Sequence, residues 1–283
     1  MDGGVSARIG LIGDWGTGIA ESTVLGMLLA SKNAHYNIHL GDVYYAGTET
    51  ESTRFVNDWP AGRRGSFALN SNHEMYSGGA GYFNVTIKST RFAAQGGAPC
   101  FALTVGRWRL VGLDGAYHAT ALMYKDGSLG PGDSEQRAWL YTQAKAAVDN
   151  GQRLVVLTHH NGLEEDEGQN RFWSDLLATV KAAGARDVVW YWGHIHAGMV
   201  YKDHDYDGVT VHGRCAGHGG VPWLPFRQDE AARYAWGEQD KAGDPREPRR
   251  ACNGFVVLDL DDEGGHETWY DEHGVAKHKA VLP

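Results

Sequence analysis

The sequence predicts an α/β fold in which β-sheets are covered by helices. Short apolar runs bounded by turn residues alternate with segments of helical periodicity. The runs are apolar almost throughout, which is typical of strands buried on both faces of a sheet. At 283 residues, the chain is long enough to bury one complete core. We therefore expect residues 1–283 to form a single domain.

The first two thirds of the chain carry the alternating elements. Strands are expected at 5–12, 36–40, 66–69, 100–105 and 107–113. A helix follows to about residue 148; Asp133 or Ser134 caps it, and Asn150 and Gly151 end it. Two further strands are expected at 153–157 and 187–192, with a helix between them at about 170–183.

The character of the sequence changes after Gly193. Shorter strands of antiparallel type are expected at 209–215, 254–260, 267–270 and 275–281. Between the first two of these lies an irregular excursion at about 221–251, which contains Trp223, Trp236 and several prolines without clear periodicity. Loop lengths allow either an ordered functional loop or a flexible excursion here.

Composition and charge exclude several classes of function. The formal net charge is −9, so the surface gives no electrostatic footprint for nucleic-acid binding, and small substrates are favoured. There is no apolar run of the roughly 20 residues that a membrane span needs. Residues 1–7 lack the features of a signal peptide, so we expect a cytoplasmic protein. Three widely spaced cysteines indicate reduced thiols, and fourteen histidines are the first hint of metal chemistry.

Side chains with oxygen or nitrogen donor atoms follow five of the predicted strands. They are Asp14 in GDWG, Asp42 and Tyr45 in GDVYY, Asn72, His73 and Glu74 in NSNHEMY, His159 and His160 after RLVVLT, and His194 and His196 in GHIH. Each motif alone would be read as an ordinary turn. Ligands of open α/β sheets bind outside the carboxyl ends of the strands, so we expect these loops to converge on one crevice.

The donors form a chemically consistent set. Two carboxylates, a phenolate, a carboxamide oxygen and three imidazoles suit iron, manganese or zinc, whereas the thiolates of a structural zinc site are missing. Seven ligands are too many for one catalytic ion and suit two ions about 3.5 to 4 Å apart, as in phosphoester hydrolysis. We expect an extended backbone at His194 and His196, which would turn both imidazoles to the same side.

The ordered set GDWG, GDVYY, NHE, a strand ending in His159, and GHIH resembles the calcineurin-like metallophosphoesterase superfamily. Most members begin with Asp-x-His, but Gly16 stands where that histidine would be. The purple acid phosphatase branch also lacks this histidine and supplies a tyrosinate from GDxxY, which Tyr45 matches. The neighbouring Tyr44 is equally able to be the buried tyrosine, and either could be ordinary core packing. The resemblance implies a four-layer α/β/β/α sandwich of two mixed β-sheets flanked by helices.

The resemblance also implies roles for individual residues. A first ion, Fe(III), would be held by Asp14, Asp42, Tyr45 and His196. A second ion, Fe(II), zinc or manganese, would be held by Asn72, His159 and His194, with Asp42 bridging the two. His73 would contact the phosphate and stabilise its charge or protonate the leaving oxygen, and Glu74 would orient His73. Hydroxide held by the metals would attack phosphorus.

The implied function is hydrolysis of a small phosphorylated substrate, foremost a phosphomonoester. Alternatives are a phosphodiesterase acting on small or nucleotide diesters, and a binding or regulatory member with little turnover. Ser71 stands where the family usually has glycine, so the backbone before Asn72 would be strained if this position needs a positive φ. Possible substrate contacts are His160, His218 in GRCAGHGG and His118, although each is equally compatible with a structural role.

Overall fold

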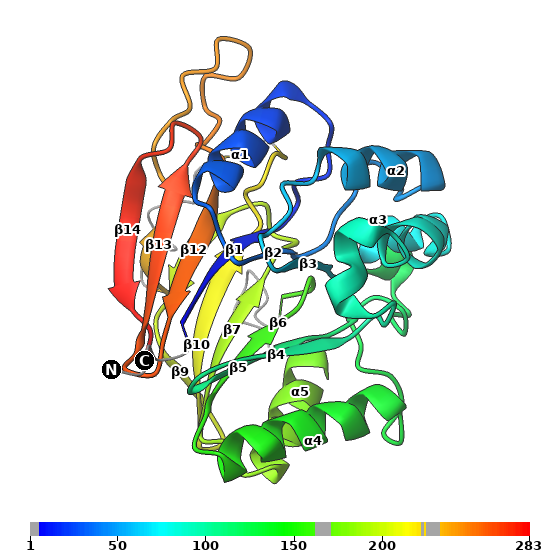
Figure 1. Ribbon diagram of the computed structural model, residues 1–283, viewed down its shortest axis with the longest axis vertical. Coiled ribbons are helices and arrows are strands. Elements are labelled where there is room, and N and C mark those ends of the chain that lie inside the picture. The colour runs from blue at the N-terminus through cyan, green and yellow to red at the C-terminus, as the bar shows by residue number, and fades with distance from the viewer. Residues whose placement is uncertain (1–5, 162–170, 222–223, 225–232) are drawn as a thin grey trace.

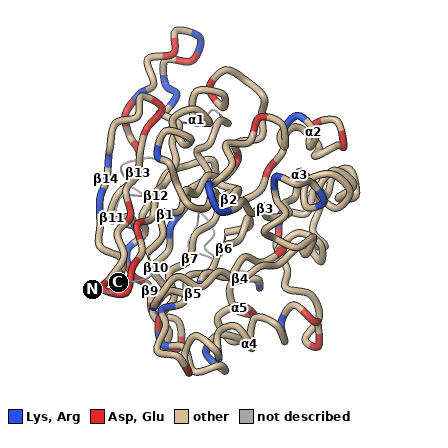
Figure 2. Tube along the Cα trace, in the orientation of Figure 1, with Lys and Arg blue, Asp and Glu red and all other residues tan. Residues whose placement is uncertain are grey.

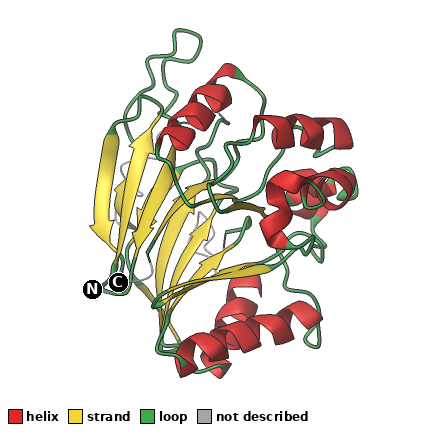
Figure 3. Ribbon diagram, viewed as in Figure 1, coloured by secondary structure: helices red, strands yellow, loops and turns green. Residues whose placement is uncertain are grey.

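The computed structural model describes residues 6–161, 171–221, 224 and 233–283. In these residues, two mixed β-sheets face each other and helices cover both outer faces (Figures 1 and 3). The four-layer arrangement expected from the sequence is therefore confirmed. Basic and acidic residues are interspersed along the chain (Figure 2).

The first sheet has the strand order β14-β13-β12-β1-β2-β3. Strands β1, β2 and β3 run parallel, while β12, β13 and β14 from the end of the chain are added antiparallel. Their bounds are β1 Ala7–Ile12, β2 Tyr36–His39, β3 Gly65–Ala68, β12 Gly254–Leu260, β13 Gly265–Asp271 and β14 Ala276–Val281.

The second sheet has the order β11-β8-β10-β7-β6-β5-β4, and β9 pairs with β10. Their bounds are β4 Phe101–Val105, β5 Trp108–Gly112, β6 Arg153–Leu157, β7 Asp187–Trp192, β8 Gly198–Tyr201, β9 His204–Tyr206, β10 Val209–Ala216 and β11 Tyr234–Gly237. Strands β5, β6, β7 and β10 are parallel. The expectation of antiparallel pairing at 209–215 is correct for the contact of β10 with β8. It is wrong for the contact of β10 with β7, which is parallel.

Helices lie outside both sheets. Beside the first sheet are α1 (Ala20–Ser31), α2 (Glu49–Asp58), the short α3 (Asn72–Met75) and the helical turns η1 (Tyr82–Thr86) and η2 (Thr90–Gln95). Beside the second are α4 (Glu135–Asp149) and α5 (Arg171–Ala182), and the turn η3 (Leu122–Tyr124) lies in the loop between β5 and α4. Among the described residues, no helix combines the length and the apolar character needed to cross a membrane.

Three apolar clusters hold the four layers together. One fills the space between the sheets and includes Leu11, Val155 and Tyr191. A second joins the first sheet to α1 and α2, and a third joins the second sheet to α4 and α5. Burial of this apolar surface is the main force that stabilises such a sandwich. Of the irregular excursion at 221–251, residues 222–223 and 225–232 lie outside the described residues, and β11 forms part of the remainder.

The parallel strands place the chemistry-bearing loops at one edge. Strands β1, β2 and β3 end just before Asp14, Asp42 and Asn72, while β6 and β7 end just before His159 and His194. Because the carboxyl ends of parallel strands meet at the same edge of a sheet, and the two sheets face each other, the five loops approach one another.

Candidate metal centre

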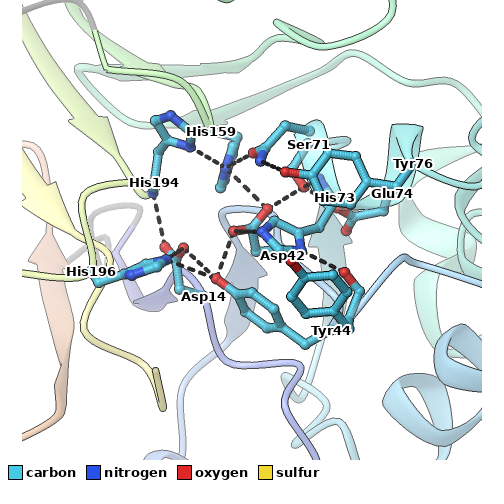
Figure 4. Close-up of polar contacts among 12 residues, drawn as sticks. Asp14, Asp42, Tyr44, Ser71, His73, Glu74, Tyr76, His159, His194 and His196 are labelled. Atoms are coloured by element: carbon cyan, nitrogen blue, oxygen red, sulfur yellow. Dashed lines mark hydrogen bonds and ion pairs between the residues drawn. The ribbon is translucent and has the colours of Figure 1, made fainter. Parts of the chain in front are cut away.

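The five strand-end loops bring their donors together in one cluster, shown in Figure 4. Asp14, Asp42 and His196 have ligand atoms that all lie within 4.8 Å of one another. Asp14, Asp42 and His159 are almost completely buried. The convergence expected from the order of the motifs is present in the structure, and it divides into two groups of donors around Asp42.

The first group surrounds the phenol of Tyr44. Its hydroxyl lies 3.0 Å from Asp14 Oδ1, 2.7 Å from Asp42 Oδ2 and 2.9 Å from His196 Nε2. His196 Nε2 lies 3.3 Å from Asp14 Oδ1. A hydroxyl has one proton and can satisfy only one of these three neighbours. His196 Nε2 can donate a second proton to Asp14 Oδ1, so this group is held by two protons, which a bound cation would replace.

The second group surrounds His159 Nε2. The other ring nitrogen, Nδ1, donates to the carbonyl oxygen of Leu40 at 2.9 Å, which fixes the tautomer and leaves a lone pair on Nε2. This Nε2 lies 2.9 Å from Asn72 Oδ1, 3.1 Å from Asp42 Oδ1 and 3.2 Å from His194 Nδ1. Burial lowers the pKa of His159 to about 3, so the ring is neutral.

Asp42 belongs to both groups, because Oδ2 faces Tyr44 and Oδ1 faces His159. Burial and the Asp42 carboxylate together raise the pKa of Asp14 to about 7. Burial lowers the pKa of His159 and His194, whereas the hydrogen bond to Asp14 raises the pKa of His196. Two buried carboxylates are therefore balanced by at most one imidazolium unless a cation binds. The residues therefore fit two metal ions: the chemistry of the donors suits borderline or hard cations, and the orientation of each His159 nitrogen follows the pattern of metal-binding histidines.

The structure places Tyr44, and not Tyr45, next to the carboxylates. The Tyr45 side chain is 68% exposed, and its ring lies 5.2 Å from that of His73 at the rim of the site. The expectation that Tyr45 would approach Asp14 and Asp42 is corrected accordingly. The two tyrosines are adjacent and chemically identical, so the sequence pattern could not decide which of them turns inward.

Four of the candidate ligands adopt left-handed backbone conformations: Asp14 (φ 59°), Asp42 (φ 74°), His194 (φ 68°) and His196 (φ 52°). Such conformations cost non-glycine residues free energy and concentrate at functional sites. They also correct the expectation of an extended backbone in GHIH. His194 and His196 lie in the loop between β7 and β8, and the two imidazoles serve different groups of donors.

Ser71 stands where the family usually has glycine, and Gly16 stands where most members have a histidine. Ser71 has φ −142°, an ordinary extended conformation, and its hydroxyl caps α3 by accepting the N–H of His73. The expected backbone strain at Ser71 is therefore absent. A Cβ atom on Gly16 would lie 2.8 Å from Val43 Cα, so the chain has no room there for the histidine of other members.

His73 and Glu74 point in different directions. His73 Nδ1 lies 2.6 Å from the carbonyl oxygen of Tyr45 and must donate to it, which leaves Nε2 3.8 Å from Asp42 Oδ2. Glu74 is buried, and its carboxyl contacts the Ser71 hydroxyl, which in turn contacts Asp42 Oδ1. Glu74 thus contacts Ser71, and His73 is oriented by the backbone carbonyl of Tyr45. The expectation that Glu74 orients His73 is corrected accordingly.

The three histidines considered as substrate contacts lie in three different surroundings. His160 is buried, and its Nε2 donates to the carbonyl oxygen of Tyr124 at 2.7 Å, so it fastens the η3 loop beside the site. His218 is buried against Gly198 and Gly254. His118 lines a separate cavity. His160 therefore lies beside the second group of donors, since its ring centroid is 5.2 Å from those of His159 and His194, whereas His218 packs against backbone and His118 belongs to the separate cavity.

Two groups that orient candidate ligands were missed in the sequence: the hydroxyl of Tyr76 and the backbone carbonyl of Leu40. Asn72 Nδ2 donates to the hydroxyl of Tyr76 at 2.9 Å, which turns the Asn72 carbonyl oxygen toward His159. The carbonyl of Leu40 orients His159. Tyr76 lies one helical turn after Asn72, and this spacing was a usable signal. A backbone carbonyl leaves no signal in the sequence.

The sequence matches no protein-family model and no curated relative. Solved structures with a similar fold include GAP50, "the anchor in the inner membrane complex of Plasmodium", with 11% identity, TM-score 0.67, 98% of this chain and 89% of that one covered. A dimetal phosphatase from Danio rerio has 14% identity and TM-score 0.58, with 97% and 98% covered. PhoD has 10% identity and TM-score 0.62, with 98% and 68% covered. The chain therefore has the fold of the calcineurin-like metallophosphoesterases.

Proposed function

We propose that this chain, whose fold is that of the calcineurin-like metallophosphoesterases, is a phosphoester hydrolase that depends on two metal ions. The observation that carries the proposal is the position of Asp42, whose two carboxylate oxygens face two separate groups of oxygen and nitrogen donors. A bridging carboxylate between two groups of ligands is the arrangement used by enzymes that hydrolyse phosphoesters with two ions.

The candidate ligands follow from the two groups. Asp14, Tyr44 and His196 would hold the first ion, and Asn72, His159 and His194 the second, with Asp42 shared. When bound, such ions polarise phosphoryl oxygens and lower the pKa of the attacking water. The buried hydrogen bond from His159 to Leu40 keeps this imidazole in the orientation that binding requires.

His73 is the residue best placed to act on the substrate itself. Because Nδ1 donates to Tyr45, Nε2 is the nitrogen turned toward Asp42, and the side chain is 12% exposed, so it can be reached from solvent. In its protonated form, Nε2 would donate to a phosphoryl oxygen or to the leaving oxygen. This role requires only that Nε2 of His73 lies beside the site, and it does not depend on a contact between His73 and Glu74.

For the finer activity, we propose a phosphomonoesterase with iron at the tyrosine site. The phenol of Tyr44 supports this choice, since a phenolate is a hard anionic ligand that suits a trivalent cation. The resemblance to purple acid phosphatases points to the same metal, with Tyr44 in place of Tyr45.

Turnover of 4-nitrophenyl phosphate and of bis(4-nitrophenyl) phosphate by metal-loaded protein tests the proposal. We expect hydrolysis of the monoester, loss of activity with a chelator and recovery when metal is added. Asp42→Asn should lower kcat by at least about a hundredfold, since it weakens the ligand shared by both ions. His118→Ala, which lies in a separate cavity, is the control.

The remaining outcomes each decide between alternatives. Hydrolysis of the diester alone would make the chain a phosphodiesterase. Bound metal without turnover of either ester would make it a binding member, and the neighbour described as an anchor shows that the fold is found outside proteins described as phosphatases. Failure to bind metal at all would overturn the proposal.

A further inference from the structure

A cavity of about 960 Å³ lies apart from the metal centre. It is bordered by η1, by the residues before β4, by the loop after β5 and by the start of α4. Its volume is in the range of pockets that hold small molecules. The residues that line it include none of the candidate metal ligands, so the cavity is a feature of its own.

Aromatic rings from three segments form the walls. Phe83 of η1 and Tyr117 of the loop after β5 meet edge to face, with ring centroids 5.8 Å apart, and Trp139 of α4 also lines the cavity. Tyr117 is 57% exposed, so much of its ring is uncovered and able to meet a ligand. Exposed faces of aromatic rings attract organic cations through the negative charge of the π system.

The charged residues that line the cavity are acidic. Asp114 is a buried carboxylate, and Asp133 and Glu135 are exposed. The lining residues, all of which lie in the described part of the chain, include no lysine or arginine. The helix start explains Asp133 and Glu135, because acidic residues stabilise the first turn of a helix such as α4. Asp114 lies outside the helix and accepts backbone N–H groups in the turn that follows β5.

Asp114 is held rigidly by hydrogen bonds, and the titratable side chain that acts on its charge from the cavity lining is His118. It accepts the backbone N–H groups of Ala116 and Tyr117 at 2.9 Å and the side-chain amide of Asn70 at 3.1 Å. Within the described residues, it forms no ion pair with lysine or arginine. Burial raises the pKa of Asp114, because the charged carboxylate loses its hydration there. A buried carboxylate at the base of an aromatic cavity is stabilised when a cation binds beside it.

We propose that this cavity binds a small organic ammonium compound, with the cationic group against Asp114 and the aromatic rings of Tyr117 and Trp139 around its alkyl substituents. The aromatic walls exclude hydrated inorganic cations as the preferred ligand, since these retain their water in place of ring contacts. The net charge of −9 favours the approach of such a ligand. The proposal is independent of phosphoester hydrolysis.

Isothermal titration of the full chain with choline tests the proposal, and 3,3-dimethylbutan-1-ol, its uncharged isostere, is the comparison. We expect one choline to bind per chain. The isostere should bind at least about tenfold more weakly, because the aromatic rings and Asp114 attract the positive charge that it lacks. Equal affinity for the two compounds would mean that the cavity recognises only their apolar groups, which would overturn the proposal. Absence of choline binding would also overturn it.

Two substitutions locate the site. Asp114→Asn keeps the hydrogen-bond acceptor for Ala116 and should lower choline affinity about tenfold while the affinity of the isostere stays unchanged. Trp139→Leu keeps an apolar wall and should weaken choline binding about fivefold. Tyr141→Leu, on the same helix but outside the cavity lining, is the control and should bind as the unsubstituted chain does. If both cavity variants bind choline unchanged, choline occupies another site and the proposal fails.

Discussion

At the scale of single residues, the two neighbouring tyrosines make the sharpest prediction. Tyr44→Phe removes the hydroxyl that lies within 3.0 Å of Asp14 and Asp42, whereas Tyr45→Phe changes only an exposed ring at the rim. With iron bound, we expect a tyrosinate-to-iron absorption band in the visible spectrum that Tyr44→Phe abolishes and Tyr45→Phe retains. Elemental analysis of both variants should show metal retained by Tyr45→Phe.

The opposite result would change the identity of the ligand. Loss of the band in Tyr45→Phe alone would mean that the loop rearranges when metal binds. A colourless protein that holds zinc or manganese would contradict the assignment to the purple branch, although it would leave two-metal hydrolysis possible.

Gly41 makes a second prediction at this scale, because it supports His159 through its lack of a side chain. Its φ is +99°, and a Cβ atom there would lie 2.6 Å from His159 Nδ1. Gly41→Ala should therefore lower the free energy of unfolding by about 2–4 kcal/mol and weaken metal binding. Gly151→Ala is the matched control, because its φ is +62° but nothing lies within 4 Å of the added atom.

Urea denaturation separates the two causes of this loss. The control should lose only about 1 kcal/mol from backbone strain. If both variants lose the same free energy and keep their metal, contact with His159 is unimportant and Gly41 serves only the turn.

The candidate ligands could be named from the sequence because their order along the chain matches the order of the strands. Asp42 and His159 come from strands of different sheets, and the shared edge of the parallel strands brings them together. Left-handed backbones at Asp14 and His196 could not be foreseen, because no local pattern favours a positive φ for these residue types there. They depend on tertiary packing.

At the scale of elements, apolar runs predicted strands well and helices less well. Strands β6 and β7 have the expected bounds, since continuous apolar runs between turn residues are a strong signal. Helix α1 was missed because its apolar residues do not form one stripe along the helix. Helix α2 was also missed, although Thr48 and Glu51 form a capping box that the sequence shows plainly.

This capping box links α2 to the site and gives the third prediction. Thr48 accepts the N–H of Glu51, while the Glu51 carboxylate accepts the backbone N–H groups of Ala46 and Thr48 and that of Tyr45 at 2.5 Å. Thr48→Ala should cost about 1 kcal/mol of stability and leave metal binding intact. Glu51→Ala should cost more, and it should also weaken metal binding because the loop that carries Tyr44 loses its anchor.

Metal retained after dialysis and urea denaturation measure the two effects. Thr53→Ala is a control within α2, since its hydroxyl contacts only the carbonyl oxygen of Glu49 on the helix surface. If Glu51→Ala retains metal as well as Thr48→Ala does, the loop is held by other contacts and the capping box serves stability alone.

At the scale of the whole molecule, the separation of the two sheets is fixed by contacts across the core. The sequence predicted the layers because apolar strands must be covered on both faces. It could not predict the cavity above Asp114, whose lining comes from segments far apart in the sequence, including η1 and α4. Its shape depends on how loops pack between elements, and local patterns do not report that packing.

A buried ion pair joins the sheets and gives the last prediction. Arg214 of β10 donates from Nε to Glu267 of β13 at 2.8 Å, and Glu267 also accepts from the Tyr191 hydroxyl at 2.7 Å. The side chains of Arg214 and Glu267 are 6% and 0% exposed. Because Glu267→Gln leaves the guanidinium buried without its counter-charge, it should cost about 3–5 kcal/mol in urea denaturation.

An exposed pair of similar geometry separates burial from pairing. Arg8 and Asp259 lie 2.7 Å apart with both side chains 46% exposed, so Asp259→Asn should cost at most about 1 kcal/mol. Equal losses at the two sites would mean that water reaches Glu267 and that the sheets are not sealed there. A large loss at Glu267 alone, with the metal ligands untouched, would show that the four-layer frame is stabilised separately from the site at its edge, because Glu267 lies between the sheets whereas the donors lie in the loops beyond their strands.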